Sequence, residues 1–185
     1  MVPFIVIVIG VILLPMILVI AMFNSLVTVR NMCKESWSNI DTELKRRYDL
    51  IPNLVETVRG YANHERGLLE RVTQCRSRAI QSTGSPESQA RDENELVREL
   101  RTLFAVVENY PELKASDNFL ELQRELTRTE DRIQAARRFY NGNVRDLNNK
   151  VQVFPSNIIA NMFGFKQGEY FEVEQVAMIK PDVDI

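Results

Sequence analysis

The sequence has little histidine, cysteine, glycine or proline. Its 185 residues include one histidine, two cysteines, seven glycines and seven prolines. Because a metal site needs several ligands at close spacing, the lone His64 predicts no metal, and we interpret it as a surface turn residue. Cys33 and Cys75 are too few for a disulfide framework and are expected to be reduced, buried or half-buried thiols. The low glycine and proline content excludes a mainly disordered chain.

The charged residues are numerous but nearly balanced, with 23 Lys and Arg against 25 Asp and Glu. No large basic field points to nucleic acid, so we expect no nucleic-acid partner. A carboxylate-metal enzyme is the remaining catalytic alternative, but the Glu-x-x-His repeats of di-iron bundles are missing. We therefore predict no enzyme, no cofactor and no small-molecule substrate, and we interpret the following carboxylates as solvated or ion-paired: Asp41, Glu43, Asp49 and Glu56.

What the sequence does contain is an apolar run from Val2 to Phe23 without a charged side chain. At about 1.5 Å per helical residue it spans roughly 33 Å, enough to cross a hydrocarbon core of about 30 Å. A cleaved signal peptide is the alternative, but the run is too long, lacks a basic n-region and ends in a poor cleavage site. We predict a retained transmembrane anchor over residues 1–23, with anchor side chains that include Val2, Phe4, Ile5, Leu13, Leu14 and Phe23.

The flanking charges predict the orientation of this anchor. Lysine and arginine stay preferentially on the cytoplasmic side of a membrane. Only the α-amino group precedes the run, whereas five basic residues follow it: Arg30, Lys34, Lys45, Arg46 and Arg47. We therefore expect a single-pass protein whose N-terminus lies outside and whose remaining residues lie in the cytoplasm.

Helical periodicity dominates the residues after the anchor, which suffice for one domain. An apolar stripe runs from Leu26 to Val58, and Pro52 predicts a kink near Asp49 or a break and restart there. The stripe continues past the proline, which favours a kink. Three further helices are expected, and each begins behind a capping side chain: Asn63, Ser85, and Ser116 or Asp117.

The first and last of these four helices are expected to be long, and short connections favour antiparallel neighbours. The predicted fold is therefore all-α, with an N-terminal transmembrane helix, an antiparallel four-helix bundle over residues 24–152, and a short amphipathic segment and tail over residues 153–185. The last long helix would return toward the membrane. Residues after Val151 are then expected near its surface.

Two segments near the C-terminus carry candidate contacts. Between Phe154 and Phe165, Ser156 is expected to cap a short helix, which either closes the bottom of the bundle or forms an interfacial or docking surface. Residues 170–176 alternate as a strand would, and are expected to pair with a neighbouring chain or to remain an extended tail. The candidate interaction residues of the two segments are Phe154, Ile158, Ile159, Met162, Phe163, Phe165, Tyr170 and Phe171.

The basic cluster Lys45, Arg46 and Arg47, with Tyr48, completes the candidate interaction surface. On a continuous helix Lys45 lies about 33 Å beyond Phe23, farther than the Debye length of about 8 Å. Direct lipid contact is therefore not expected. We predict that this cluster pairs with carboxylates of a neighbouring helix or of a partner subunit.

Several separate blocks resemble the LemA family in the right order, over about residues 20–172. The blocks are Arg30-Asn31 with Lys34 to Asp41, Leu44 to Glu56, Glu108 to Ser116, Ala136 to Asn141, and Phe154 to Asn157. The resemblance implies a bacterial inner-membrane protein with an outside N-terminus and a cytoplasmic antiparallel helical bundle, and it implies no particular chemistry. Cys33 stands where the family commonly has an aliphatic residue, which favours core packing over redox work.

These observations together predict a non-enzymatic, membrane-anchored scaffold or adaptor of the bacterial inner membrane. It is expected to act through protein–protein contacts as a homo-oligomer, with lipid around its N-terminal helix and a further protein partner of unknown identity. The alternative is a membrane-remodelling or envelope-stress component whose segment from Phe154 to Phe165 engages lipid.

Overall fold

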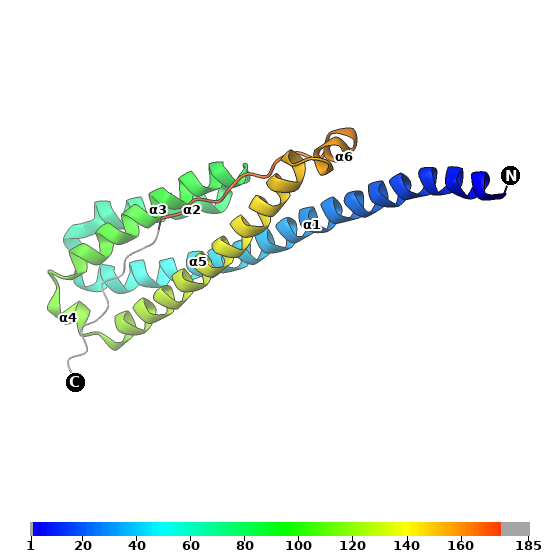
Figure 1. The fold of residues 1–185 in the computed structure, drawn as a ribbon. Coiled ribbons are helices and arrows are strands. Elements are labelled where there is room, and N and C mark those ends of the chain that lie inside the picture. Colours follow the sequence, from blue (N-terminus) through cyan, green and yellow to red (C-terminus); the bar gives the residue numbers. More distant parts are fainter. Residues whose placement is uncertain (1, 175–185) are drawn as a thin grey trace. The chain divides into compact units, whose positions relative to one another are not determined.

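The computed structural model describes the backbone of residues 2–174, and side chains from residue 13 onward except that of residue 63. The predictions for the side chains of Val2, Phe4 and Ile5, and for residues 175–185, lie outside the described residues. Within residues 2–174 the regular secondary structure is entirely helical. Its elements are α1 (Val2–Tyr61), the 3-10 turn η1 (Asn63–Glu65), α2 (Arg66–Gln81), α3 (Pro86–Val107), α4 (Pro111–Lys114), α5 (Asp117–Gln152) and α6 (Ser156–Met162), shown in Figure 1.

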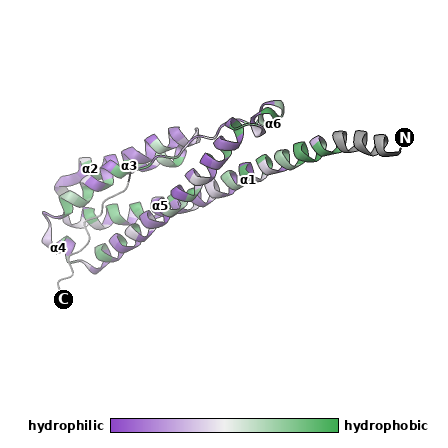
Figure 2. Ribbon diagram, viewed as in Figure 1, coloured by the Kyte–Doolittle hydropathy of each residue, from purple (hydrophilic) through white to green (hydrophobic). Residues whose placement is uncertain are grey.

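The apolar run and the first amphipathic stripe form one helix, α1. Figure 2 shows hydrophobic residues gathered on the first turns of α1 that are coloured by hydropathy, ahead of a stretch of mixed character. The helix continues through Pro52, so the less favoured alternative, a break and restart at this proline, is wrong. A proline removes one backbone hydrogen bond, and burial of the neighbouring Ile51, Leu54 and Val55 holds the helix together around that gap.

The helix starts follow local chemistry in part. Ser85 caps α3 as expected, because its side chain accepts a hydrogen bond from the Ser88 amide and Pro86 occupies the first turn. Asn63 does not cap α2: the turn η1 intervenes, and α2 begins behind Glu65 without a side-chain cap. The buried Ala62 explains this, since its carbonyl accepts from the Glu65 amide at 3.1 Å and tightens the turn.

The chain divides into two compact units. Unit 1 contains residues 1–37 and 139–168, and unit 2 contains residues 38–138 and 169–185. Helices α1 and α5 contribute residues to both.

In unit 1, α1 and α5 are in contact through Trp37 and Tyr140. Their rings pack edge to face, with the ring centroids 5.2 Å apart. Cys33 is buried, and burial followed by the charge of Asp146 raises the pKa of its thiol. The prediction that this thiol is buried is confirmed.

The core of unit 2 gathers apolar side chains from five helices. In Figure 1, α2 and α3 lie side by side, and they share this core with the second half of α1, with α4 and with α5. The fully buried members include Leu54, Val58, Val72, Leu96, Leu100, Leu103 and Leu113. These residues recur at intervals of three and four along their helices, so the periodicity of the sequence reports the buried faces.

Candidate functional site

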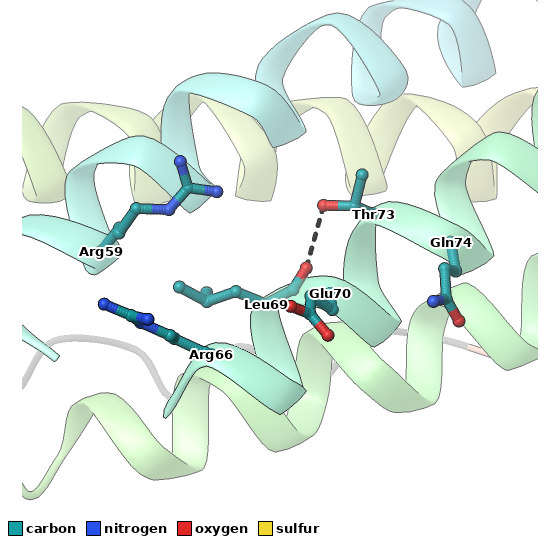
Figure 3. Close-up of a pocket in the computed structure, with 6 residues that line it drawn as sticks. All are labelled: Arg59, Arg66, Leu69, Glu70, Thr73 and Gln74. Carbon is teal, nitrogen blue, oxygen red and sulfur yellow. Dashed lines mark hydrogen bonds between the residues drawn. The ribbon is translucent and has the colours of Figure 1, made fainter. Parts of the chain in front are cut away.

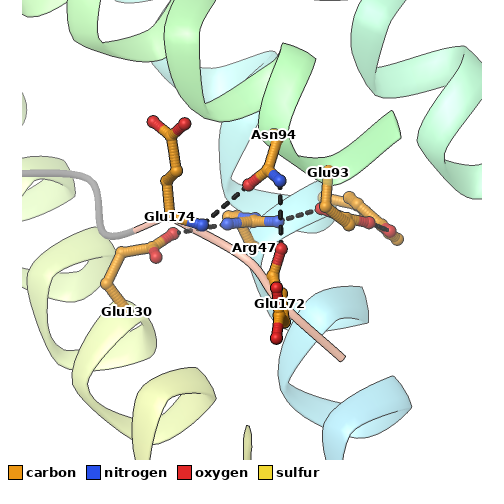
Figure 4. Close-up of polar contacts among 7 residues, drawn as sticks. Arg47, Glu93, Asn94, Glu130, Glu172 and Glu174 are labelled. Carbon is orange, nitrogen blue, oxygen red and sulfur yellow. Dashed lines mark hydrogen bonds and ion pairs between the residues drawn. The ribbon is translucent and has the colours of Figure 1, made fainter. Parts of the chain in front are cut away.

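A buried arginine with two carboxylates lies in unit 2 (Figure 4). Arg47 of α1 is fully buried, and it pairs with Glu93 of α3 and, at 2.8 Å, with Glu130 of α5. The Tyr48 hydroxyl donates to Glu93. This cluster ties three helices together, and the expected pairing of the basic residues with carboxylates of neighbouring helices is confirmed for Arg47.

Burial and charge shift the protonation of this cluster. Burial raises the pKa of the Glu93 carboxyl, although Arg47 and the Tyr48 hydroxyl act in the opposite direction. Burial, and then the charge of Glu93, raise the pKa of Tyr48. Burial lowers the pKa of Arg47, but Glu130 and Glu93 outweigh it and the net shift is upward, so the guanidinium stays charged.

The expected interaction surface around this cluster is smaller than the sequence suggests. Arg47 is not on a surface at all, because its charge is neutralised inside the protein. Lys45 and Arg46 are exposed, with Arg46 3.3 Å from Glu43 on the same helix, and Tyr48 is half-buried.

The tail segment, residues 169–174, is extended against unit 2 without forming a strand (Figure 4). Its side chains alternate: Phe171 and Val173 are buried, whereas Glu172 and Glu174 are exposed. The alternation predicted from the sequence is thus confirmed over these positions. Tyr170 is exposed, whereas Phe171, expected as a contact residue, is 0% exposed.

Side chains of α3 and α5 hold the backbone of the tail segment. The Asn94 side-chain amide donates to the Glu172 carbonyl at 3.0 Å and accepts from the Glu174 amide at 2.7 Å. Arg137 donates to the Val173 carbonyl. Asn94 therefore offers the tail the same donor and acceptor pair that a neighbouring β-strand would offer.

A similar arrangement holds the preceding residue in unit 1. Asn148 of α5 donates to the Gly168 carbonyl at 3.0 Å and accepts from the Gly168 amide at 2.7 Å. A Cβ atom at this glycine would lie 3.4 Å from Val144, so the backbone approaches α5 closely.

The amphipathic segment forms α6 and packs within unit 1 against the end of the apolar run. Ile159, Ala160 and Phe165 are buried with Leu26 of α1, and the Phe23 ring lies 4.7 Å from Phe163. Ser156 does not cap this helix. Its hydroxyl instead donates to the Lys150 and Val153 carbonyls at the end of α5, and Pro155 occupies the cap position.

Helix α6 and the turn before it also carry exposed apolar side chains. The exposed fractions are 75% for Phe154, 51% for Ile158 and 68% for Met162. On α1, Leu13 and Leu14 are likewise exposed, as side chains that face lipid would be. The segment therefore has buried side chains that pack against α1, as the first expected role requires, and exposed apolar side chains, as an interfacial or docking surface requires.

A hollow of about 520 Å³ lies between α1 and α2 in unit 2 (Figure 3). Figure 3 shows Arg59 and Arg66 beside Leu69, with Glu70, Thr73 and Gln74 along the wall. Arg59 pairs with Glu56 at 2.7 Å, and the Thr73 hydroxyl donates to the Leu69 carbonyl. Within the described residues no group of three His, Cys, Asp or Glu side chains is close enough to hold a metal ion.

Residues 36–185 match the model of the LemA family. The chain belongs to the LemA family. It is 27% identical over 161 residues to Protein LemA of Metamycoplasma hominis, covering 87% of this chain and 73% of that protein. It is 26% identical over 175 residues to Magnetosome protein MamQ 2 of Paramagnetospirillum magneticum and 24% identical over 174 residues to Magnetosome protein MamQ of Magnetospirillum gryphiswaldense. This chain covers 64% of each magnetosome protein, less than two thirds of its length.

Among the described residues of this LemA-family chain, α1 is the helix that is long and apolar enough to cross a membrane. Together with the resemblance to its relatives, this helix indicates a membrane-associated protein.

Sequence reasoning predicted a carboxylate partner for Arg47 of this LemA-family chain, but it missed the burial of that ion cluster, its partners Glu93 and Glu130, and the roles of Asn94 and Asn148. A signal for the cluster does exist, because Arg47 falls between Leu44 and Ile51 on the apolar stripe. Glu93 and Glu130 occupy stripe positions of α3 and α5 in the same way. Charges of opposite sign on three apolar faces indicate mutual pairing. For the two asparagines no such signal exists, since polar residues on helices are ordinarily solvated.

Proposed function

We propose that this LemA-family chain is a non-enzymatic, single-pass scaffold of the bacterial inner membrane that acts as a homo-oligomer through protein–protein contacts. In this proposal the N-terminus lies outside, and residues 24–152 form an antiparallel four-helix bundle in the cytoplasm. The excess of basic over acidic residues just after the apolar run supports this orientation. Two relatives are named magnetosome proteins, and association with a cellular structure supports a scaffold role.

The observation that carries the proposal is the way unit 2 holds the tail segment. The Asn94 side chain forms hydrogen bonds with the backbone of Glu172 and Glu174, and the alternating side chains Phe171 and Val173 are buried. This combination of main-chain hydrogen bonds and alternating apolar anchors is the chemistry by which proteins recognise extended segments of other chains. The same segment of a neighbouring copy has the same chemistry, so exchange of tails between copies would join them.

The first experiment is the native mass of the full-length protein in nanodiscs or mild detergent, with co-purifying proteins identified. A uniform homo-oligomer is the expected result. A monomer that carries one recurrent partner would contradict the homo-oligomer and indicate an adaptor, whose exposed residues Lys45 and Arg46 would then be the surface to mutate.

A complementation experiment tests tail exchange directly. Asn94→Ala impairs the site on unit 2, and Phe171→Glu impairs the segment that fills it. Each variant alone should lose the oligomer, whereas a mixture should regain part of it, because the intact site of one variant can hold the intact tail of the other. Asn118→Ala, an exposed asparagine in the same unit, is the matched control. A mixture that forms no more oligomer than its two variants form separately would refute tail exchange.

A second candidate function is supported by the exposed apolar side chains of α6. In this alternative the chain is a membrane-remodelling or envelope-stress component whose segment from Phe154 to Phe165 engages lipid. It differs from the scaffold in its partner, because the contact is made with the bilayer rather than with another protein.

A further inference from the structure

The position of α6 along α1 fixes its height above a membrane. Helix α6 packs against Met22, Phe23, Leu26 and Val27, which are the last residues of the apolar run and the first turn after it. If the 22 residues from Val2 to Phe23 span the hydrocarbon core, Phe23 lies at its boundary. Helix α6 then lies in the adjoining headgroup layer, where interfacial helices insert.

The exposed side chains of α6, and of the turn before it that contains Phe154, have the composition that this layer favours. Phe154, Ile158 and Met162 are each at least half exposed, although they lie within nine residues of one another along the chain. The side toward α1 is already filled by Ile159 and Ala160. A short helix that is apolar on two sides buries one side in the protein and needs a second apolar environment for the other.

Charge points to the same surroundings. Unit 1 contains five Lys and Arg residues against two Asp and Glu, whereas unit 2 contains 18 against 23. Three of the basic residues of unit 1 adjoin the α6 core in sequence or in space: Arg30, Lys150 and Lys166. The Arg30 guanidinium lies 4.9 Å from the centroid of the Phe165 ring, and none of the three forms an ion pair with a described residue. Such cations beside an apolar surface suit the phosphate groups of anionic lipids.

We propose that Phe154, Ile158 and Met162 form a membrane-docking surface in the headgroup layer of the bilayer crossed by α1, and that Arg30, Lys150 and Lys166 contact anionic lipid phosphates there. This inference deepens the second candidate function, in which the segment from Phe154 to Phe165 engages lipid, and it rests on the membrane-crossing of α1. It does not depend on oligomerisation.

A fluorophore in the full-length protein tests the docking surface. An environment-sensitive probe is attached at Met162→Cys in a background of Cys33→Ala and Cys75→Ala, and the protein is reconstituted into vesicles that contain lipids with a quencher near the headgroups. The matched control places the probe at Ile80→Cys, an exposed apolar residue of α2 with an exposed fraction of 46%. The probe at position 162 should be strongly quenched and the control probe should not.

Lipid charge tests the basic residues. Vesicles of phosphatidylcholine alone are compared with vesicles that also contain phosphatidylglycerol, at low and at high salt. Quenching at position 162 should increase with phosphatidylglycerol and decrease with salt. Each of Arg30→Gln, Lys150→Gln and Lys166→Gln should lower the ratio of docked to undocked protein in the anionic vesicles by up to about fivefold.

Three outcomes would contradict parts of this proposal separately. Equal quenching at positions 162 and 80 would overturn the docking surface. Quenching at position 162 that ignores lipid charge would overturn the assignment of the three basic residues. Protein that an alkaline wash removes from the vesicles would instead refute the membrane-crossing of α1, which belongs to the proposed function.

Discussion

Units 1 and 2 differ in how many of their charged and apolar side chains find partners within the chain. In unit 2 ion pairs within the chain recur along the helices, and one cluster of them is buried, with the fully buried Arg47 between Glu93 and Glu130. In the described part of unit 1 the ion pair is Arg145 with Asp146 at 3.9 Å, while cations and apolar rings near α6 stay exposed. The difference teaches that charged side chains of unit 2 find partners in the chain itself, whereas exposed cations and apolar side chains of unit 1 suit a partner outside the chain.

The largest expected effect comes from breaking the buried cluster of unit 2. Arg47→Met leaves Glu93 and Glu130 buried without a counter-charge, and should lower the free energy of unfolding by about 3–5 kcal/mol. Guanidinium unfolding of the full-length protein in mild detergent, followed by helical circular dichroism, measures this. The triple variant Arg47→Met, Glu93→Leu and Glu130→Leu should recover most of the loss, and a triple variant as unstable as the single one would contradict the ion-pair explanation.

A smaller effect is expected where the tail segment meets unit 2. Asn94→Ala removes both side-chain hydrogen bonds to the tail and should lower the free energy of tail opening by about 1–3 kcal/mol. Hydrogen exchange of a peptide that covers residues 171–174 measures this opening. Asn118→Ala should leave the exchange unchanged, and protection that survives Asn94→Ala would show that the buried Phe171 and Val173 hold the tail without the amide.

The pH dependence of the free energy of unfolding should reflect the titration of Tyr48 in unit 2. Its pKa is raised in the folded protein, so its stabilising contribution is present below the unfolded pKa of about 10 and is lost as the pH rises above that value. Tyr48 alone should lower the free energy of unfolding by about 1.4 kcal/mol between pH 9 and pH 11. The comparison with Tyr48→Phe isolates this loss, because the variant lacks the titrating group. Parallel stability curves for the two proteins over this range would refute the assignment.

The sequence predicts the helices of both units better than it predicts their contacts. Apolar spacing and the Ser85-Pro86 start are local properties, so α1, α3 and α5 are recognisable from the residues alone. The position of Arg47 on the apolar stripe indicates its burial, but its carboxylate partners follow it by 46 and 83 positions, and no local pattern identifies them. The asparagine contacts with the tail depend on the same long-range arrangement. Local pattern therefore yields the faces of the helices, and the fold decides which polar residues those faces enclose.

The smallest effect on stability is expected at α6, and it separates the two interpretations of this helix. Ile158→Asn and Met162→Asn alter exposed positions, so each should change the free energy of unfolding in detergent by less than about 0.5 kcal/mol, as should Ile80→Asn in unit 2. In vesicles, however, the two α6 variants should reduce the lipid contact of a probe at Phe154→Cys, and Ile80→Asn should not. A loss of about 2 kcal/mol or more in detergent would place Ile158 or Met162 in a protein core. Helix α6 would then close the bottom of the bundle. The contrast between unit 2, whose charges pair within the chain, and unit 1, whose exposed groups suit lipid, would be lost.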